Sequence, residues 1–366
     1  MLKIGITGGK GFIGWHLRSF LHAQKDTAVI VADRDLFASE EALAGFAASC
    51  DVIVHLAGMN RGNDSDVAGT NIRIVETLVR ACRAAGSRPH IIFSSSTHIY
   101  RDTPYGNSKK ICAGIIQKWA AEENALFTNL VLPNIFGEGG KPFYNSVVST
   151  FCFQLANGQK PRIIDDAAIE ILHAQRVARN IFSLIGKRTA GEVRLPGESI
   201  LVSQLSAKLT EMAGAYAANE IPELGTPREL DLFNTYRSYL FPAKYPVNAG
   251  AWSAGRGGIS AALKSLNGGT SAVSAIAPGG TAGNHYHTRK IERLAVLEGS
   301  ALVRVRKLFS DKIDEFALDG ASPRYIDIPT LHAYSVVNNG KGRLKVLSWA
   351  NKASDPDNSD TFQETV

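Results

Sequence analysis

The chain has 366 residues, 45% of them hydrophobic, and a formal net charge of +6 with a sequence pI near 9.1. This length and apolar content are sufficient for two folded domains. The basic residues are dispersed and lack the clustering with aromatic residues that follows a nucleic acid, so we expect no nucleic-acid partner and an anionic small-molecule ligand.

Cellular location follows from apolar runs and cysteine usage. No apolar run approaches the length of a membrane span, and Met1–Ile4 enter a predicted strand directly. The four cysteines stand singly, without a CxxC pair, which is typical of buried thiols in a reducing compartment. We therefore expect a cytoplasmic protein with no membrane partner.

The first part of the chain alternates predicted strands and helices. In chain order these are strand Leu2–Thr7, helix Phe12–Leu21, strands Ala28–Ala32 and Asp51–Leu56, helix Val67–Ala84, strand His90–Phe93, a long helix from Pro104, and strand Phe127–Leu132. This alternation predicts an α/β domain of the Rossmann type, with a doubly wound parallel sheet. Helical and mixed segments from about Asn145 to Tyr239 are expected to form a substrate-side lobe.

The pattern changes near Phe241–Pro246, where two prolines mark a linker. The strands expected beyond it are Ser271–Ile276, Arg293–Leu297, Ala301–Arg306, Arg324–Ile328 and Leu344–Trp349. Short strands separated by glycine-rich turns predict a small all-β sandwich or barrel. We therefore expect two domains, residues 1–243 and residues 244–366.

A glycine pattern lies between the first predicted strand and the first predicted helix. Gly8, Gly11 and Gly14 let the backbone approach a pyrophosphate that rests on the helix N-terminus, which predicts a dinucleotide cofactor. At the end of the second strand, Asp33 would hold a ribose hydroxyl and favour NAD, whereas Arg34 would pair with a 2′-phosphate and favour NADP. The sequence leaves both cofactors open.

A reductase centre is predicted from Tyr105 and Lys109, which lie one helical turn apart on the same face. The ammonium favours proton transfer from the phenol, so Tyr105 can protonate a carbonyl oxygen as hydride reaches its carbon. Upstream, the serine-rich end of a strand at Ser94–Thr97 offers a hydroxyl to hold that oxygen.

Together these motifs resemble the extended short-chain dehydrogenase/reductase superfamily. The resemblance implies that Ser96, or Thr97 in its place, is the hydroxyl partner. It also implies cofactor contacts from residues around the glycine loop, the third strand and the catalytic helix: Phe12, Ile13, Leu56, Ala57, Gly58 and Lys109.

A metal site is predicted in the C-terminal part. His285 and His287 alternate on a predicted strand and therefore share a face, and Glu292 can return to that face from the next strand. Two imidazoles and a carboxylate are ligands for a divalent metal. With Gly279 and Gly299 at their usual spacing, this set resembles the first cupin motif, which implies a cupin barrel.

The segment from Pro329 to Asn338 resembles the second cupin motif, with one departure. Tyr334 stands where that motif has histidine, and His332 lies two residues earlier. Because residues 332 and 334 share a face on an extended strand, His332 is a candidate fourth ligand. A site with three protein ligands, or with no metal, is the alternative.

The motifs as a series extend the resemblance to nearly the whole chain. They are Val54–Arg61, Ser94–Ser96, Pro104–Lys110, Leu132–Gly137, Tyr144–Cys152, Asn284–His287 and Trp349–Phe362. This series resembles the bifunctional capsular-polysaccharide enzymes of the CapF/WbjC type, which make UDP-2-acetamido-2,6-dideoxy-β-L-talose. The resemblance implies a homodimer with NADPH and zinc, a nucleotide-sugar substrate, 3-epimerisation by the cupin domain, and 4-keto reduction by the N-terminal domain.

By the same resemblance, the substrate contacts in the reductase domain are Asn134, Tyr144 and Asn145. In the cupin domain, Tyr334 and Arg256 are expected at the substrate, and with His332 they are the candidates for the epimerase base. The family pattern is departed from at His173–Arg176, where we expect an altered lobe contact or altered packing rather than altered chemistry.

Two other functions compete with the bifunctional interpretation. The shifted His332 is compatible with a plain 4-keto-sugar reductase whose cupin domain is structural or dimerising. A non-enzymatic nucleotide sensor is the third hypothesis, and the intact pair of Tyr105 and Lys109 argues against it.

Overall fold

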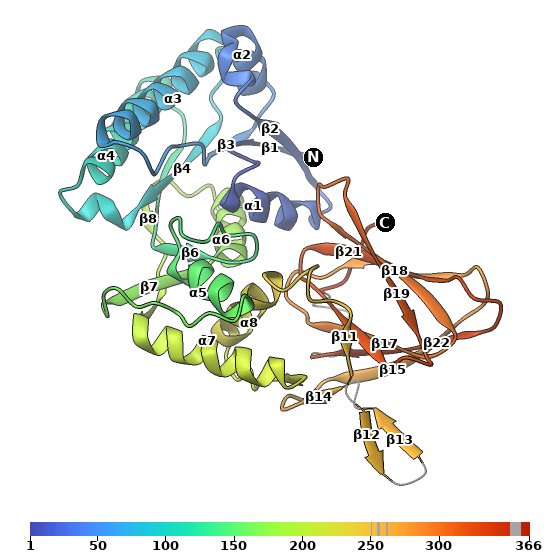
Figure 1. Cartoon of the computed structure of the whole chain (residues 1–366). Helices are drawn as coiled ribbons and strands as arrows, with labels where there is room; N and C mark the ends of the chain where they lie inside the picture. The colour runs from blue at the N-terminus through green and yellow to red at the C-terminus, as the bar shows by residue number, and fades with distance from the viewer. Residues whose placement is uncertain (250, 255–256, 261–262, 352–359) are drawn as a thin grey trace. The chain divides into compact units, whose positions relative to one another are not determined.

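The computed structural model describes residues 1–249, 251–254, 257–260, 263–351 and 360–366 (Figure 1). By its internal contacts the chain divides into two compact units. The first unit comprises Met1–Ile135 and Ala168–Ile200, and the second comprises Phe136–Ala167 and Leu201–Val366.

The helices and strands that lie mainly in the first unit are β1 (Leu2–Thr7), α1 (Phe12–His22), β2 (Thr27–Ala32), the 3-10 helix η1 (Leu36–Ala38), α2 (Glu40–Ala48), β3 (Val52–His55), α3 (Asp64–Ala84), β4 (His90–Ser96), the 3-10 helix η2 (Thr97–Tyr100), α4 (Pro104–Glu123), β5 (Phe127–Leu132), β6 (Asn134–Phe136), β7 (Ala168–His173), α6 (Ala174–Gly186), β8 (Gly191–Arg194) and β9 (Glu198–Leu201). Every strand and helix predicted before residue 133 is present.

The central sheet of the first unit is parallel, with the strand order β2-β1-β3-β4-β5-β8. Alternate residues of each strand enter opposite cores, because side chains alternate across a strand. Ile53 packs with α2, α3 and α4, whereas its neighbours Val52 and Val54 pack with α1 and α6. Figure 1 shows the same division, with α3 and α4 on one side of the sheet and α1 and α6 on the other. The predicted doubly wound sheet is confirmed.

The segment His173–Arg176 makes a packing contact between α6 and α1. The Gln175 side-chain amide donates to the His16 carbonyl at 3.1 Å and lies 3.0 Å from His16 Nδ1. His173 precedes α6 and its ring lies edge-on to His16, with centroids 5.8 Å apart. This departure from the family pattern therefore lies within the packing of the first unit.

The helices and strands of the second unit are α5 (Val147–Ala156), α7 (Val202–Ala217), β10 (Glu220–Ile221), α8 (Pro227–Ser238), β11 (Val247–Asn248), β12 (Ala251–Ala254), β13 (Gly257–Ser260), β14 (Lys264–Ser265), β15 (Thr270–Ile276), β16 (Thr281–Tyr286), β17 (Glu292–Glu298), β18 (Ser300–Lys307), β19 (Ile313–Asp319), β20 (Arg324–Ile328), β21 (His332–Asn338), β22 (Leu344–Ala350) and β23 (Phe362–Gln363).

Two antiparallel sheets dominate the second unit, in the orders β11-β20-β17-β22-β15 and β19-β18-β21-β16-β23. They share one apolar core, to which Leu294 and Ile326 contribute from the first sheet and Val303 and Val336 from the second. The C-terminal half is therefore an antiparallel β-domain, as its short predicted strands indicated.

Helices that we assigned to a reductase-side lobe pack in the second unit. Helices α5, α7 and α8 belong to it by their contacts. Phe241 and Tyr245, in the segment predicted as a linker, pack against the core of the two sheets. A boundary near residue 244 stays a prediction about which parts fold independently.

A buried ion pair holds β17 against β20. Arg293 Nε and one terminal nitrogen donate to the two Asp327 carboxylate oxygens at 2.7 and 2.8 Å, and both side chains are at most 2% exposed. The guanidinium also stacks on the Tyr325 ring at 3.8 Å, and Tyr216 of α7 donates to the same carboxylate. Burial alone would raise the pKa of Asp327, but the charge and hydrogen bonds of Arg293 outweigh burial and the pKa is lowered.

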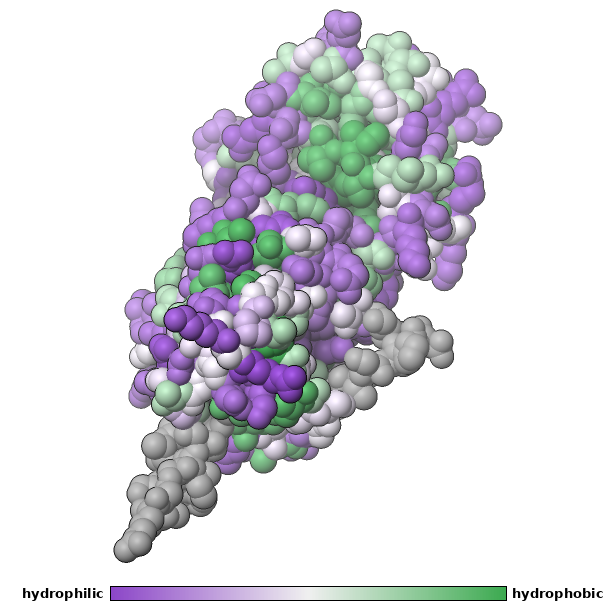
Figure 2. Space-filling model, turned by 90° about the vertical axis from the view of Figure 1, so that its right-hand side faces the viewer, coloured by the Kyte–Doolittle hydropathy of each residue, from purple (hydrophilic) through white to green (hydrophobic). Residues whose placement is uncertain are grey.

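The cysteines, the helix lengths and the surface can be compared with the expectations from composition. The four cysteines, Cys50, Cys82, Cys112 and Cys152, are free and buried, as predicted. Among the helices in the described ranges, none is long and apolar enough to cross a membrane. Figure 2 shows hydrophobic side chains gathered within the upper, N-terminal part of the view and framed by hydrophilic ones.

We expect Asp327→Asn to lower the free energy of unfolding by about 3–5 kcal/mol, because it leaves the Arg293 guanidinium buried without a counter-charge. The matched control is Glu315→Gln. Glu315 pairs with Arg304 across two strands of the neighbouring sheet, with Oε1 2.8 Å from the Arg304 Nε. This ion pair is exposed to solvent, since the Glu315 side chain is 50% exposed and the Arg304 side chain 41%. That control should change stability by less than about 1 kcal/mol. Urea denaturation measures both, and equal effects would contradict the prediction.

Candidate active sites

The glycine loop has the close approaches that its sequence predicts. Gly8 has φ +69°, and a Cβ there would lie 2.8 Å from the Ala57 backbone nitrogen. A Cβ on Gly14 would lie 2.3 Å from the Gly8 carbonyl oxygen, so the first turn of α1 packs directly on the loop. Gly11 is the N-cap of α1 and offers no side-chain cap, which leaves the helix N-terminus available to an anion.

The loop after β3 lies beside the glycine loop. Thr7 at the end of β1 receives the Leu56 and Ala57 backbone N–H groups through its carbonyl and hydroxyl oxygens, both at 3.2 Å. Gly58 lies against Asn71, whose Oδ1 would be 3.1 Å from a Cβ on the glycine. Phe12 and Ile13 form the first turn of α1. The expected cofactor residues therefore gather at the carboxyl ends of β1 and β3.

The end of β2 carries charges of both signs. Asp33 forms an ion pair with Lys10 of the glycine loop at 3.0 Å, and this hydrogen bond lowers the pKa of Asp33. Arg34 is exposed next to it. The acid predicted to receive a ribose hydroxyl thus already has a cationic partner.

Tyr105 lies in the first turn of α4, where three neighbours fix its backbone. Thr103 caps the helix by accepting the Gly106 N–H at 3.1 Å, and Pro104 occupies the first helical position. A Cβ on Gly106 would lie 2.2 Å from the His98 carbonyl oxygen, so α4 begins in direct contact with η2. The Tyr105 and His98 rings pack edge-on with centroids 5.7 Å apart.

Lys109 is the buried charge of this site. Its ammonium donates to the Ser94 carbonyl at 2.9 Å and lies 4.7 Å from the centre of the Phe93 ring and 5.8 Å from that of Tyr105. Burial lowers the pKa of Lys109 to about 8. Burial and the charge of Lys109 together lower the pKa of His55 to about 3, so this imidazole is neutral and is hydrogen-bonded to Thr7.

The candidate hydroxyls follow directly on β4. Ser96 ends β4 and caps η2 by accepting the His98 N–H at 3.3 Å, and Thr97 begins η2. Both are half-buried, whereas Ser94 and Ser95 are buried. The structure therefore brings Tyr105, Lys109 and the Ser96–Thr97 turn to one edge of the sheet, as the motif predicts.

The expected substrate contacts belong to both units of the chain. Asn134 is exposed and donates to the Glu170 carbonyl at 3.1 Å. In the second unit, Tyr144 lies under the Lys141 ammonium, which is 5.3 Å from the ring centre, and Asn145 is exposed. Arg256 lies outside the described residues.

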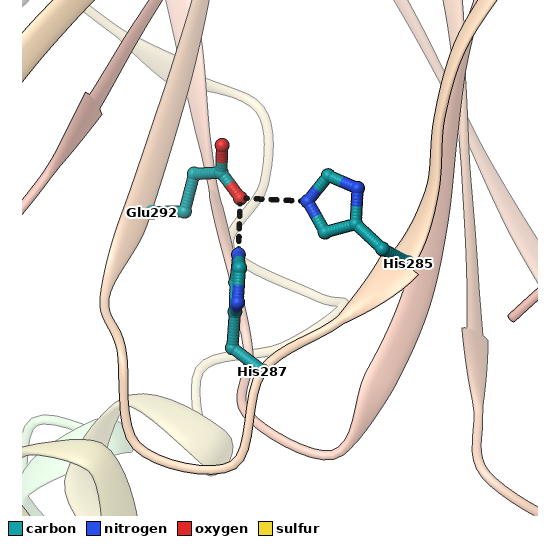
Figure 3. A group of neighbouring side chains, drawn as sticks. All are labelled: His285, His287 and Glu292. Carbon is teal, nitrogen blue, oxygen red and sulfur yellow. Dashed lines mark hydrogen bonds and ion pairs between the residues drawn. The ribbon is translucent and has the colours of Figure 1, made fainter. Parts of the chain in front are cut away.

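The predicted metal ligands converge at the junction of β16 and β17 (Figure 3). His287 Nε2 and His285 Nε2 lie 2.7 and 3.6 Å from the same Glu292 oxygen, and the ligand atoms of all three residues lie within 4.8 Å of one another. Burial would raise the pKa of Glu292, but its interactions with the two imidazoles lower it to about 2. The three side chains point toward one another from the two strand ends.

This donor set fits a divalent metal. A tetrahedral ion with bonds of about 2.0–2.1 Å holds its ligand atoms roughly 3.3 Å apart, and the two nitrogen–oxygen distances lie on either side of that value. The carboxylate is ionised, and His287 Nδ1 is hydrogen-bonded to the Asp360 carbonyl, which leaves Nε2 for an ion. His285, His287 and Glu292 are therefore the residues that could hold one.

The residue of β21 that lies against this cluster is Tyr334. Its ring lies 4.8 Å from that of His285, centroid to centroid, and burial and the nearby Glu292 carboxylate raise the pKa of its phenol well above the usual range. The structure does not bring His332 into the described cluster. His332 Nδ1 bonds to the Thr330 carbonyl at 2.8 Å, its ring packs edge-on against Phe241, and burial lowers its pKa to about 4.

One residue beside the candidate metal site received no role in the functional assignments made from sequence. Asp360 was part of a family-like motif, but no role followed from its position, because it lies 73 residues from His287. Its carboxylate accepts the backbone N–H groups of Arg289 and Lys290 at 2.8 and 2.7 Å. Sequence spacing carries no signal for such a distant contact.

Two family models match the chain. The NAD dependent epimerase/dehydratase family matches residues 4–194, which are 191 of the 366 residues. The polysaccharide biosynthesis C-terminal domain matches residues 253–362, a range that includes His285, His287 and Glu292.

Known proteins are similar over the whole chain or over part of it. UDP-2-acetamido-2,6-beta-L-arabino-hexul-4-ose reductase of Pseudomonas aeruginosa is 26% identical over 370 residues, covering 100% of this chain and 99% of that protein. D-erythronate dehydrogenase of Haemophilus influenzae is 25% identical over 58% of this chain and 83% of its own length. The crystal structure of the capsular polysaccharide assembling protein CapF from Staphylococcus aureus has 28% identity and a TM-score of 0.65, covering 99% and 100% of the two chains.

We expect Lys109→Met to abolish the chemistry of this site while raising the free energy of unfolding by about 2 kcal/mol at neutral pH. The lowered pKa of Lys109 corresponds to a cost of about 3 kcal/mol for its charge in the folded state. Loss of the hydrogen bond to the Ser94 carbonyl offsets about 1 kcal/mol. Urea denaturation measures the difference, and Lys110→Met, at the exposed neighbouring position, is the control.

The pH dependence gives this prediction a second test. Between pH 8 and 10.5 the unfolded chain keeps the Lys109 proton and the folded chain releases it, so wild-type stability from this group rises with pH. The advantage of the variant should therefore narrow across that window. A variant less stable than wild type at neutral pH would mean that the ammonium is net stabilising where it lies.

Proposed function

Because the chain belongs to the NAD dependent epimerase/dehydratase family, we propose that it is a bifunctional enzyme acting on a UDP-4-keto-6-deoxy-N-acetylhexosamine. The second unit inverts carbon 3, and the first unit then reduces the 4-keto group with NADPH to give UDP-2-acetamido-2,6-dideoxy-L-talose. The observation that carries the proposal is that one chain holds both Tyr105 beside the buried Lys109 and the cluster of His285, His287 and Glu292.

The substrate class is supported by the relatives. The Pseudomonas aeruginosa protein, similar over the full length, is named for the reduction of a UDP-linked 4-ketohexose. The Staphylococcus aureus protein, also similar over the full length, is named for capsular polysaccharide assembly. The proposal extends to a cupin barrel for the antiparallel sheets, zinc as the ion, and a homodimer.

The reduction step gives a role to Tyr105, to Lys109 and to the hydroxyl of Ser96 or Thr97. The nicotinamide cofactor supplies the hydride when bound. As the carbonyl carbon gains its new C–H bond, the π electrons move to the oxygen and Tyr105 protonates it. The Lys109 ammonium stabilises the phenolate left behind, and the hydroxyl of Ser96 or Thr97 holds the carbonyl oxygen in place.

NADPH is favoured by the charges at the end of β2. In an NAD site a free carboxylate accepts the ribose hydroxyls, but here Asp33 is paired with Lys10. Lys10 and the exposed Arg34 supply two cations at the position that a 2′-phosphate would occupy. Two cations beside this acid favour a phosphate, which they bind by charge-assisted hydrogen bonds, over an uncharged hydroxyl.

Epimerisation requires the hydrogen on carbon 3 to leave one face and return to the other. The neighbouring carbonyl makes this hydrogen acidic, and a divalent ion held by the cluster supplies Lewis-acid stabilisation to the developing enolate. Burial and the Glu292 charge raise the pKa of Tyr334 well above its usual range, so its phenol keeps a proton at neutral pH. A protonated phenol cannot accept the carbon 3 proton, so Tyr334 is set aside as the base, and His332 and Arg256 are the sequence candidates left for that role.

A plain 4-keto-sugar reductase is the second candidate. It is favoured by the separation of His332 from the cluster, which leaves three protein ligands among the described residues. Metal analysis of the purified protein separates the two functions. Stoichiometric metal that is lost in His285→Ala argues for a working centre, and a metal-free wild type argues for the plain reductase.

We expect the two half-reactions to be lost separately in two variants. Tyr105→Phe should lower reduction by roughly 10²–10⁴-fold, because it removes the proton donor, and should leave exchange of the carbon 3 hydrogen with deuterated water intact. His285→Gln should abolish that exchange but still reduce substrate supplied as the 3-epimer. NMR of the sugar follows both events.

The wild-type enzyme provides the decisive control. If it reduces the 4-keto sugar with NADPH but never exchanges the carbon 3 hydrogen under the same conditions, the bifunctional proposal fails and the plain reductase stands. If neither variant affects its assigned step, both site assignments fail.

A further inference from the structure

Asp360 organises the turn that joins two of the metal ligands. Its buried carboxylate accepts the backbone N–H groups of Thr288, Arg289 and Lys290 at 3.1, 2.8 and 2.7 Å, and the Thr288 hydroxyl as well. These residues form the turn between His287 and Glu292. One carboxylate therefore satisfies consecutive backbone donors that would otherwise be left without a partner at a buried position.

The main chain of the same residue orients the His287 ring. The Asp360 carbonyl lies 2.6 Å from His287 Nδ1, and the Thr361 hydroxyl is more distant at 3.5 Å. Because a carbonyl only accepts, Nδ1 must carry the hydrogen. Nδ1 is thereby engaged by the Asp360 carbonyl, and Nε2, 2.7 Å from the Glu292 carboxylate, is the ring atom that faces the cluster.

The residues after Asp360 hold the other histidine. Strand β23 pairs Gln363 with His285, immediately after an irregularity in β16 between Gly283 and His285. Asn284 lies within this irregularity and has φ +54°. The C-terminal segment hydrogen-bonds to both its main chain and its side chain. The Glu364 N–H donates to the Asn284 carbonyl at 2.9 Å, and the Val366 N–H donates to its side-chain oxygen at 3.3 Å. A bulge re-aims the side chain that follows it, so this pairing sets the direction of His285.

The segment is also tied to β18 by charge. Arg306 donates to the Glu364 carboxylate and to the Thr365 carbonyl, each at 2.7 Å, and both ionic side chains are mostly buried. The described C-terminal segment Asp360–Val366 is therefore bonded to both histidine-bearing parts of the cluster and to the neighbouring strand.

We propose that Asp360 is a positioning residue of the metal centre, and that docking of the C-terminal segment Asp360–Val366 and binding of a divalent ion stabilise each other. This inference rests on the metal site of the proposed function. A ligand set that is imposed by remote contacts binds an ion more tightly than one that must reorganise. Coupling of this kind is reciprocal, so the ion must in turn hold the segment in place.

The test compares two aspartates that cap turns in the same unit. Asp319 accepts the Ala321 N–H at 2.8 Å and the Ser300 hydroxyl, away from the cluster. In full-length protein, Asp360→Asn turns an amide toward backbone donors and should weaken Zn²⁺ or Co²⁺ binding by roughly 10–100-fold in a competition with a chromophoric chelator. Asp319→Asn should leave the affinity within about threefold of wild type. Equal affinities for all three proteins would overturn the proposal.

A second measurement needs no variant and so does not depend on the folding of Asp360→Asn. Hydrogen exchange of the Glu364 and Val366 amides should slow on addition of Zn²⁺ to metal-free wild type, whereas the Ala321 amide should be unaffected. Exchange at Glu364 and Val366 that is indifferent to the ion overturns the coupling. Wild-type protein that binds no ion at all refutes the metal site of the proposed function instead, so the two failures are distinguishable.

Discussion

The buried ion pair between Arg293 and Asp327 is the constraint on which the second unit depends. Glu292 and Arg293 are consecutive on β17 and leave opposite faces of the strand. Arg293 is fixed by Asp327 of β20 and stacked on Tyr325, and the same carboxylate receives Tyr216 from α7. A charge buried to this depth is stable only with its partner in place, so the ion pair fixes the start of β17 relative to β20. Glu292 is thereby presented to His285 and His287.

Both sites use burial to set the protonation of a group, with opposite results. In the first unit no carboxylate of the described residues offsets the burial of Lys109, so burial lowers its pKa and the ammonium is held by the Ser94 carbonyl and the Phe93 ring. In the second unit the two imidazoles outweigh burial and keep Glu292 ionised. Burial penalises charge at both places, and the neighbours decide whether the charge survives. The direction of each pKa shift is therefore decided by the neighbouring groups and not by burial alone.

The sequence predicted what local periodicity and spacing encode. The strand Phe127–Leu132 was predicted at both of its observed ends, and the long helix at its observed start near Pro104. The two-residue spacing of the candidate metal-binding histidines anticipated their convergence. The helix α2 was missed, although it lies in the first unit. Contacts between distant segments were not predictable in the same way. The bond between Tyr216 and Asp327 places α7 with the β-domain and joins residues 111 positions apart, and no periodicity reports such a contact.

The chemistry of the proposed substrate dictates the order of the two reactions. Carbon 3 can lose a proton only while carbon 4 is a ketone, because the carbonyl is what stabilises the resulting negative charge. Once hydride has converted that ketone to an alcohol, the hydrogen on carbon 3 is no longer acidic and the configuration can no longer change. In the proposed scheme, reduction at Tyr105 therefore makes permanent the configuration that the candidate metal cluster has produced. A chain with both proposed functions would convert a reversible inversion into a defined product, since the reduction proposed for the first unit consumes the ketone on which the inversion proposed for the second unit depends.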